Sequence, residues 1–139
     1  TNSNVKPQQL AIASVNDKQE MVYVGGKYKD GVLSVKTSKF GKFCVTYDTT
    51  EPTITPKFTS GENLSTSKRI EFQLKDNFSG VDSYSATIDG KWVAIDYAKG
   101  IASINLIDEG VKGEVEHSVT ISISDACGNK ASWSGKFVK

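Results

Sequence analysis

Apolar and polar residues alternate with a period of two along nearly the whole chain, and this pattern restricts the fold more than any other feature. The run VTISIS at residues 119–124 shows it most clearly. Strands place successive side chains on opposite faces, so the alternation predicts half-buried strands. No segment has the 3.6-residue spacing of an amphipathic helix, and we therefore predict an all-β fold. The predicted strands span residues 10–15, 20–24, 31–36, 42–47, 53–58, 69–75, 83–88, 91–97, 101–106, 116–124 and 131–138.

Turn-forming residues separate these runs and indicate how they are grouped. Asp89-Gly90 predicts a two-residue hairpin, because both central positions of a type I′ turn need a positive φ. The polar connector at residues 48–52 ends in a proline, as links between domains often do. We therefore predict two parts. Residues 50–139 form an immunoglobulin-like antiparallel β-sandwich of seven strands, preceded by additional β-strands in residues 1–49, which are a β-strand segment or the tail of a preceding β domain.

Composition argues against two classes of partner. The 139 residues have a net charge of +1, and 16 of the 17 basic residues are lysines, with Arg69 as the only arginine. A nucleic-acid-binding surface normally contains a basic stripe that includes arginines, so we expect no nucleic-acid partner. No run approaches the roughly 18 apolar residues of a transmembrane helix, so we expect no membrane span in this chain.

Candidate catalytic residues are few. His117 is the only histidine, it opens an alternating strand, and no Gly-x-Ser-x-Gly segment accompanies it. We interpret it as a histidine at a strand end near solvent. Asp89, Asp96, Asp108 and Glu109 could act as a glycosidase pair only in a deep cleft, which a small sandwich seldom has. We therefore predict that the chain is not an enzyme and has no catalytic residues.

Trp92 is the candidate ligand-binding residue. It is out of phase with Val93 and Ile95 and shares the more polar face of its strand with Asp96. An aromatic side chain on a sheet face can stack on a sugar ring, which indicates a carbohydrate-binding role. The alternative is that Trp92, like Trp133, packs in the core or at an edge of the sandwich.

Sandwich topology brings three separate stretches to one end of the fold. The loops that follow the strands at 69–75 and 116–124 both lie at the end where the connector enters. We therefore expect Asp48, Glu51, Asp76 and Asp125 in one neighbourhood. Either these side chains accept backbone N–H bonds within their own turns, or they bind a calcium ion, which prefers several carboxylate and carbonyl oxygens. We expect no other cofactor.

The two cysteines are expected near the same end. Cys44 lies on the polar face of its strand and Cys127 lies in a turn, so neither has the pattern of a buried core residue. In an oxidising compartment this favours a disulfide between them, provided that their Cα atoms come within about 7 Å. Two free thiols are the alternative.

Residues 40–56, 76–81, 88–93 and 125–131 carry a family resemblance. Their order and spacing resemble the C-terminal β regions of lysostaphin-like zinc peptidoglycan endopeptidases of Bacteroidetes, although the Asp-x-x-Gly-Asn turn at 125–129 is shared with many bacterial immunoglobulin-like repeats. The resemblance implies a protein of the bacterial cell envelope, periplasmic or surface-exposed, whose peptidase domain lies upstream. That domain holds zinc with two histidines and an aspartate and uses a further histidine, so none of its positions maps onto a chain with one histidine.

Two functions follow from these observations. The first is a non-catalytic accessory, spacer or targeting module of a cell-envelope protein, with a cell-wall peptidase as the parent. Its partners would be the upstream domain of the same polypeptide and a cell-wall glycan or another envelope protein. The alternative is a carbohydrate- or glycan-binding module that uses Trp92.

Overall fold

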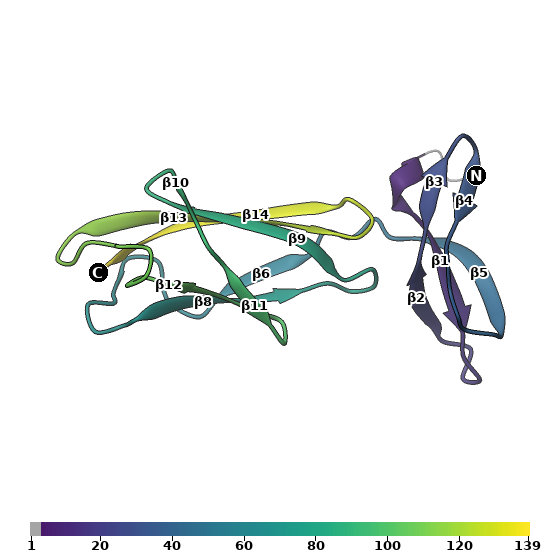
Figure 1. Cartoon of the computed structure of the whole chain (residues 1–139), viewed down its shortest axis with the longest axis horizontal. Helices are drawn as coiled ribbons and strands as arrows, with labels where there is room; N and C mark the ends of the chain where they lie inside the picture. Colours follow the sequence, from purple (N-terminus) through teal and green to yellow (C-terminus); the bar gives the residue numbers. More distant parts are fainter. Residues whose placement is uncertain (1–3) are drawn as a thin grey trace.

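The structure, a computed structural model, describes residues 4–139 and confirms the all-β prediction. Fourteen strands and one short 3-10 turn, η1 (Pro7–Gln9), make up its regular structure. Within this described range no helix is long and apolar enough to cross a membrane. The strands form two parts, and Figure 1 shows the N-terminal part at one end of a longer sandwich whose C-terminus lies at the opposite end.

Two sheets of the immunoglobulin type form the sandwich. One has the strand order β10 (Lys91–Val93), β9 (Val81–Ile88), β13 (Glu116–Asp125), β14 (Lys130–Val138) and β7 (Glu62–Asn63). The other has the order β11 (Asp96–Ala98), β12 (Ile101–Asn105), β8 (Arg69–Lys75) and β6 (Thr53–Pro56). Short β7 pairs parallel with β14, and the other pairs are antiparallel.

The hydrophobic core lies between these two sheets. The inward-facing residues of β8 and β13 are nearly inaccessible to solvent: Ile70, Phe72, Leu74, Val119, Ile121 and Ile123. Phe72 makes edge-to-face contacts with Phe58 and with Trp133, at ring-centroid distances of 5.6 and 5.4 Å. Gly135 makes room for this cluster, because a Cβ atom at that position would collide with the indole ring of Trp133. The apolar residues of the alternating runs are therefore the residues that form the core.

The Asp89-Gly90 hairpin forms as predicted, but the single strand predicted at 91–97 is wrong. Asp89 and Gly90 have φ values of 52° and 77°, as a type I′ turn requires. After the turn, β10 ends at Val93, and β11 belongs to the opposite sheet. The sequence pattern does not reveal this change of sheet, because Val93 and Ile95 both contact the core and so keep the alternation of a single strand. Val93 lies in the first sheet, and Ile95 lies in the segment that crosses to the second.

The N-terminal part consists of two small sheets. A three-stranded sheet has the order β2 (Met21–Gly25), β1 (Leu10–Val15) and β5 (Lys42–Tyr47), and β3 (Lys27–Lys29) forms a hairpin with β4 (Val32–Ser34). Across residues 4–139, none of these strands pairs with a strand of the sandwich. In its described residues, 4–49, the fully buried hydrophobic side chains are those of Ala11 and Ala13. That residues 1–49 and 50–139 are separate folding units stays a prediction.

Candidate functional site

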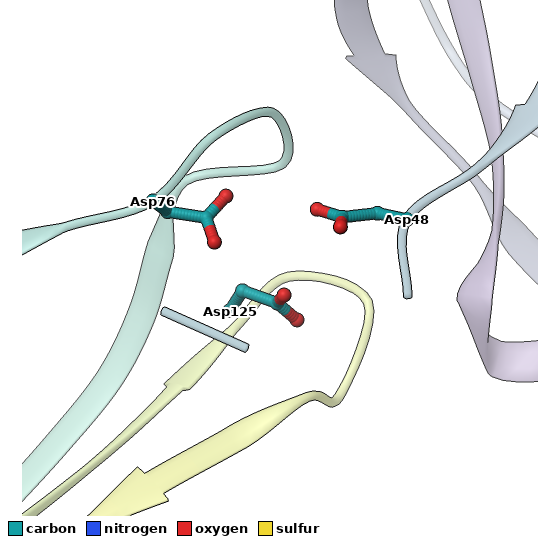
Figure 2. Close-up of side chains that lie close together, drawn as sticks. All are labelled: Asp48, Asp76 and Asp125. Atoms are coloured by element: carbon teal, nitrogen blue, oxygen red, sulfur yellow. The ribbon is translucent and has the colours of Figure 1, made fainter. Parts of the chain in front are cut away.

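Three aspartates from distant parts of the sequence meet where the N-terminal part joins the sandwich. Asp48 follows β5, Asp76 follows β8 and Asp125 ends β13, and one carboxylate oxygen from each lies within 4.8 Å of the others. Figure 2 shows the side chains of Asp48 and Asp76 pointing toward each other, with that of Asp125 beside them. We call these three residues the junction aspartates. Both Asp48 and Asp125 are only 2% exposed.

Glu51, the fourth residue predicted for this group, does not belong to it. Glu51 lies three residues beyond Asp48 in the connector, which places it up to about 10 Å farther along the chain. The Glu51 side chain is exposed there. The topology therefore predicts which loops converge, but it does not determine which residues of the connector lie at the point where they meet.

Each junction aspartate closes its own turn by accepting backbone N–H groups. Oδ2 of Asp76 accepts from Phe78 and Gly80 at 3.0 and 2.7 Å. Oδ1 of Asp125 accepts from Cys127 and Asn129 at 2.9 and 2.8 Å. Oδ1 of Asp48 accepts from Thr50 at 3.1 Å. Asp and Asn commonly stabilise turns in this way, and this is the first of the two roles expected for these residues.

The same side chains also connect the two parts. Oδ2 of Asp48 accepts from the backbone N–H of Ser79 at 3.1 Å and from its hydroxyl at 2.6 Å. The side-chain amide of Asn129 donates to the carbonyl oxygen of Asp48 at 2.9 Å and to Oδ2 of Asp125 at 2.7 Å. The Gln9 amide, from the N-terminal part, donates to Oδ1 of Asn129 at 2.7 Å. The junction is thus a buried hydrogen-bond network rather than a loose tether.

Among residues 4–139, no cationic side chain forms an ion pair with a junction aspartate. Burial raises the pKa of Asp125, and the charges of Asp48 and Asp76 raise it further, against the lowering effect of the hydrogen bonds from Asn129. Oδ1 of Asp76 is buried and has no hydrogen-bond partner. Several carboxylates with a free oxygen are a donor set that suits a hard cation.

Both cysteines are free thiols in the structure, which differs from the predicted disulfide. Cys44 pairs with Ala13 inside the three-stranded sheet, about 13 Å along β5 from Asp48. Cys127 is 2% exposed, contrary to the expectation of an unburied turn residue, because the N-terminal part covers the turn, where Gln8 lies against Gly128. This burial raises the pKa of the Cys127 thiol.

Trp92 is exposed, as the phase of its strand predicts. Trp92 lies on the edge strand β10 and is 68% exposed. It lines a groove of about 550 Å³ between the β9–β10 hairpin and the loop at 109–115, together with Glu109, Lys112 and Val115. Oε1 of Glu109 accepts the backbone N–H of Ala94 at 3.0 Å, which fastens this loop to the crossover between the sheets.

His117 borders the same groove and is buried, so its predicted position near solvent is wrong. His117 lies two residues before Val119 on β13, so both side chains point to the same, core-facing side of the strand, where His117 is opposite Phe137. The alternation in the sequence already indicates this orientation. Its Nδ1 lies 2.6 Å from Oδ2 of Asp89, and its Nε2 lies 2.9 Å from the carbonyl oxygen of Lys112. Both partners are acceptors, so both bonds form only when the ring carries two protons. With Nε2 held by a backbone carbonyl, the ring has no nitrogen left to activate a nucleophile.

Stability is expected to fall as the pH rises past the folded-state pKa of His117. Burial opposes the charge on this ring, but the hydrogen bonds to Asp89 and to the Lys112 carbonyl outweigh it and raise the pKa above 6.5. The stabilisation is therefore complete below pH 6.5 and is lost above the raised pKa. Thermal unfolding of the wild type between about pH 5.5 and 8.5 should show the decline, and His117→Gln should flatten it. An equally steep decline in His117→Gln would contradict this assignment.

Comparisons with known proteins give a family match over the N-terminal part and a structural likeness over a larger share of the chain. A family model described as a Zu5-like domain matches residues 1–48, the N-terminal part. No curated protein matches the chain. Among solved structures, the endo-β-1,4-mannanase of Thermotoga petrophila is similar to this chain at 16% identity, with a TM-score of 0.52. The likeness covers 66% of this chain but 20% of the mannanase chain, and it shows a shared β fold alone.

Proposed function

We propose that this chain is a non-catalytic accessory module that holds a neighbouring domain of a bacterial cell-envelope protein, a cell-wall peptidase, in a fixed orientation. The observation that carries the proposal is the network in which Asp48, Ser79 and Asn129 join the two parts. A flexible tether would leave such groups in water, whereas here they are buried and paired. The chain also enters the sandwich at one end and leaves it at the other, which suits a spacer (Figure 1).

The upstream domain of the same polypeptide is the proposed partner. One face of the three-stranded sheet supports this, because apolar side chains from β2 and β5 lie exposed on it. Register places Val22, Phe43, Val45 and Tyr47 on this face, with exposures of 44%, 39%, 69% and 50%. Contiguous exposed apolar residues usually mark an interaction surface. The junction would then fix the sandwich relative to the N-terminal part, and this face would fix the N-terminal part against the upstream domain.

The fixed orientation can be tested by ¹⁵N relaxation of the labelled chain. We expect one rotational correlation time for the strands of both parts. Asn129→Ala removes the two hydrogen bonds that its side chain makes across the junction, with Asp48 and Gln9, and should separate the two correlation times. Asn63→Ala, at an exposed site on β7, should not. Independent tumbling in the wild type would overturn the spacer function. Release of muropeptides from purified sacculi by this chain would overturn its non-catalytic character.

The junction aspartates are the proposed site of a calcium ion that would stiffen this contact. Two observations on the part of the chain that the structure describes support the proposal: Oδ1 of Asp76 has no hydrogen-bond partner, and neither Asp48 nor Asp125 forms an ion pair. A ligand that binds only the native state must raise its melting temperature. We therefore expect millimolar calcium to raise the melting temperature of chelator-treated protein by several degrees.

Two variants separate a calcium site from a general salt effect. Asp76→Asn should abolish the calcium-dependent rise, whereas Asp82→Asn removes an exposed charge nearby and should preserve it. A wild-type melting temperature unmoved by calcium would remove the ion and leave the hydrogen-bonded junction in place.

A carbohydrate-binding module is the second candidate function. The exposure of Trp92 beside a groove with polar residues favours it, because an indole face stacks on sugar rings while neighbouring polar groups orient them. A similar fold within a protein named as an endo-β-1,4-mannanase also supports it. Retention of the chain on an insoluble polysaccharide, lost in Trp92→Ala, is the expected result.

A further inference from the structure

The outward face of the five-stranded sheet carries an array of small hydroxyl side chains. Alternate residues of 83–87 on β9, 120–124 on β13 and 132–134 on β14 are all serine or threonine. Their register aligns them in rows across the strands, such as Ser85, Ser122 and Ser132. We call this array the hydroxyl face. The residues between them, such as Ala86 and Ile121, face the core.

The other sheet shows that solvent-exposed strand positions in this chain are not always serine or threonine. This sheet has two central strands. The outward positions of β8 are long and mostly charged, Arg69, Glu71, Gln73 and Lys75, and those of its neighbour β12 are Ile101, Ser103 and Asn105. On the hydroxyl face, by contrast, the rows of serine and threonine carry no charge, and the charged residues Lys130, Glu116 and Lys136 lie toward the ends of the strands. The outward face of β8 thus carries long, mostly charged side chains, whereas the rows of serine and threonine on the hydroxyl face are flat, polar and neutral.

Small side chains also give this face a shape that an extended ligand could occupy. Strands lie about 4.8 Å apart and alternate residues about 6.7 Å apart, so the hydroxyls form a regular grid. A shallow depression of about 490 Å³ lies over Ser83, Ser85, Ser122 and Ser132, and Lys130 is the one charged residue that lines it. Cross-strand hydroxyl pairs, such as Thr120 with Ser134 at 2.9 Å, fix the orientation of these groups. Each hydroxyl can donate one bond and accept two, so such pairing leaves further capacity for a ligand.

Trp92 stands at the edge of this face. It pairs with Thr87, which in turn aligns with Thr120 and Ser134, so the indole extends one row of the grid. We propose that an extended strand of an uncharged polysaccharide lies across the hydroxyl face and stacks on Trp92. The neutral hydroxyl grid matches a neutral polyhydroxyl ligand, whereas an anionic polymer would require cationic side chains between the rows. This inference rests on the carbohydrate-binding candidate and names its surface and ligand class.

Pull-down on insoluble mannan, cellulose and chitin at high salt tests the proposal with the whole chain. Ser122→Arg places a bulky charge at the centre of the hydroxyl face, and Gln73→Arg places the same side chain on the outward face of the other sheet. We expect the wild type and Gln73→Arg to be retained equally on at least one polymer. Ser122→Arg and Trp92→Ala should each weaken retention at least tenfold. Melting temperatures confirm folding, and Ser85→Arg replaces Ser122→Arg if that variant unfolds.

The outcomes distinguish the surface from the function. Retention that survives Ser122→Arg but is lost in Trp92→Ala overturns the hydroxyl face and keeps carbohydrate binding at the groove beside Trp92. Equal losses in Gln73→Arg and Ser122→Arg would also overturn it, because a general charge effect would explain both. No retention of the wild type on any of the three polymers overturns the proposed surface, and soluble sugar fragments titrated against Trp92 fluorescence then decide the carbohydrate-binding candidate separately.

Discussion

Replacing Asp125 with alanine is expected to lower the free energy of unfolding by about 3 kcal/mol. The Asp125 carboxylate is 2% exposed and accepts the backbone N–H groups of Cys127 and Asn129 and the side-chain amide of Asn129. Alanine would leave these buried donors unpaired, at a cost of about 1–3 kcal/mol for each such group. Relief of the repulsion from Asp48 and Asp76 offsets part of this loss. Urea denaturation in the presence of a chelator measures the difference.

Two control variants separate the loss of hydrogen bonds from the loss of charge and from the effect of truncating any aspartate. Asp125→Asn keeps a carbonyl oxygen that can accept the backbone N–H bonds and removes the negative charge, so we expect a loss below about 1 kcal/mol. Asp82→Ala truncates an exposed aspartate nearby and should change stability by no more than about 0.5 kcal/mol. If Asp125→Ala costs no more than Asp82→Ala, the network at the junction does not hold the structure together.

Local periodicity and turn chemistry predict most of the sandwich. Residues 119–124 alternate because one face of β13 meets the core, and Asp89-Gly90 turns the chain because both residues accept a positive φ. The meeting of Asp48, Asp76 and Asp125 is also readable, since the topology places the loops after β8 and β13 at the end where the connector enters. Each of these features depends on a short stretch or on general rules of connection.

What the sequence does not reveal depends on contacts between distant elements. Alternation on β5 separates Cys44 from Val45, but it does not say which side is covered, and the structure exposes Val45 and half-buries Cys44. The pairing of His117 with Asp89 follows from a register between β13 and a turn that no local pattern encodes. Two features could have been predicted from the sequence alone: the core-facing side chain of His117, and the row of serines at residues 83 and 85 on the outward face.

The largest loss of stability is expected from Phe72→Ala, at about 4 kcal/mol. Phe72 is 0% exposed on a central strand and contacts the rings of Phe58 and Trp133, so truncation removes buried surface and leaves a cavity between the sheets. Neighbouring side chains on paired strands cannot close such a cavity completely.

Phe43→Ala is the matched control because it makes the same truncation on the three-stranded sheet. Phe43 is 39% exposed and lies outside the hydrophobic cluster, which spans residues 64–137, so the expected loss is below about 1 kcal/mol. Urea denaturation followed by tryptophan fluorescence measures both variants, since Trp133 lies within the core and Trp92 outside it. Comparable losses would show that the N-terminal sheet contributes to the core on which the sandwich depends. The two-part division of stability would then be wrong.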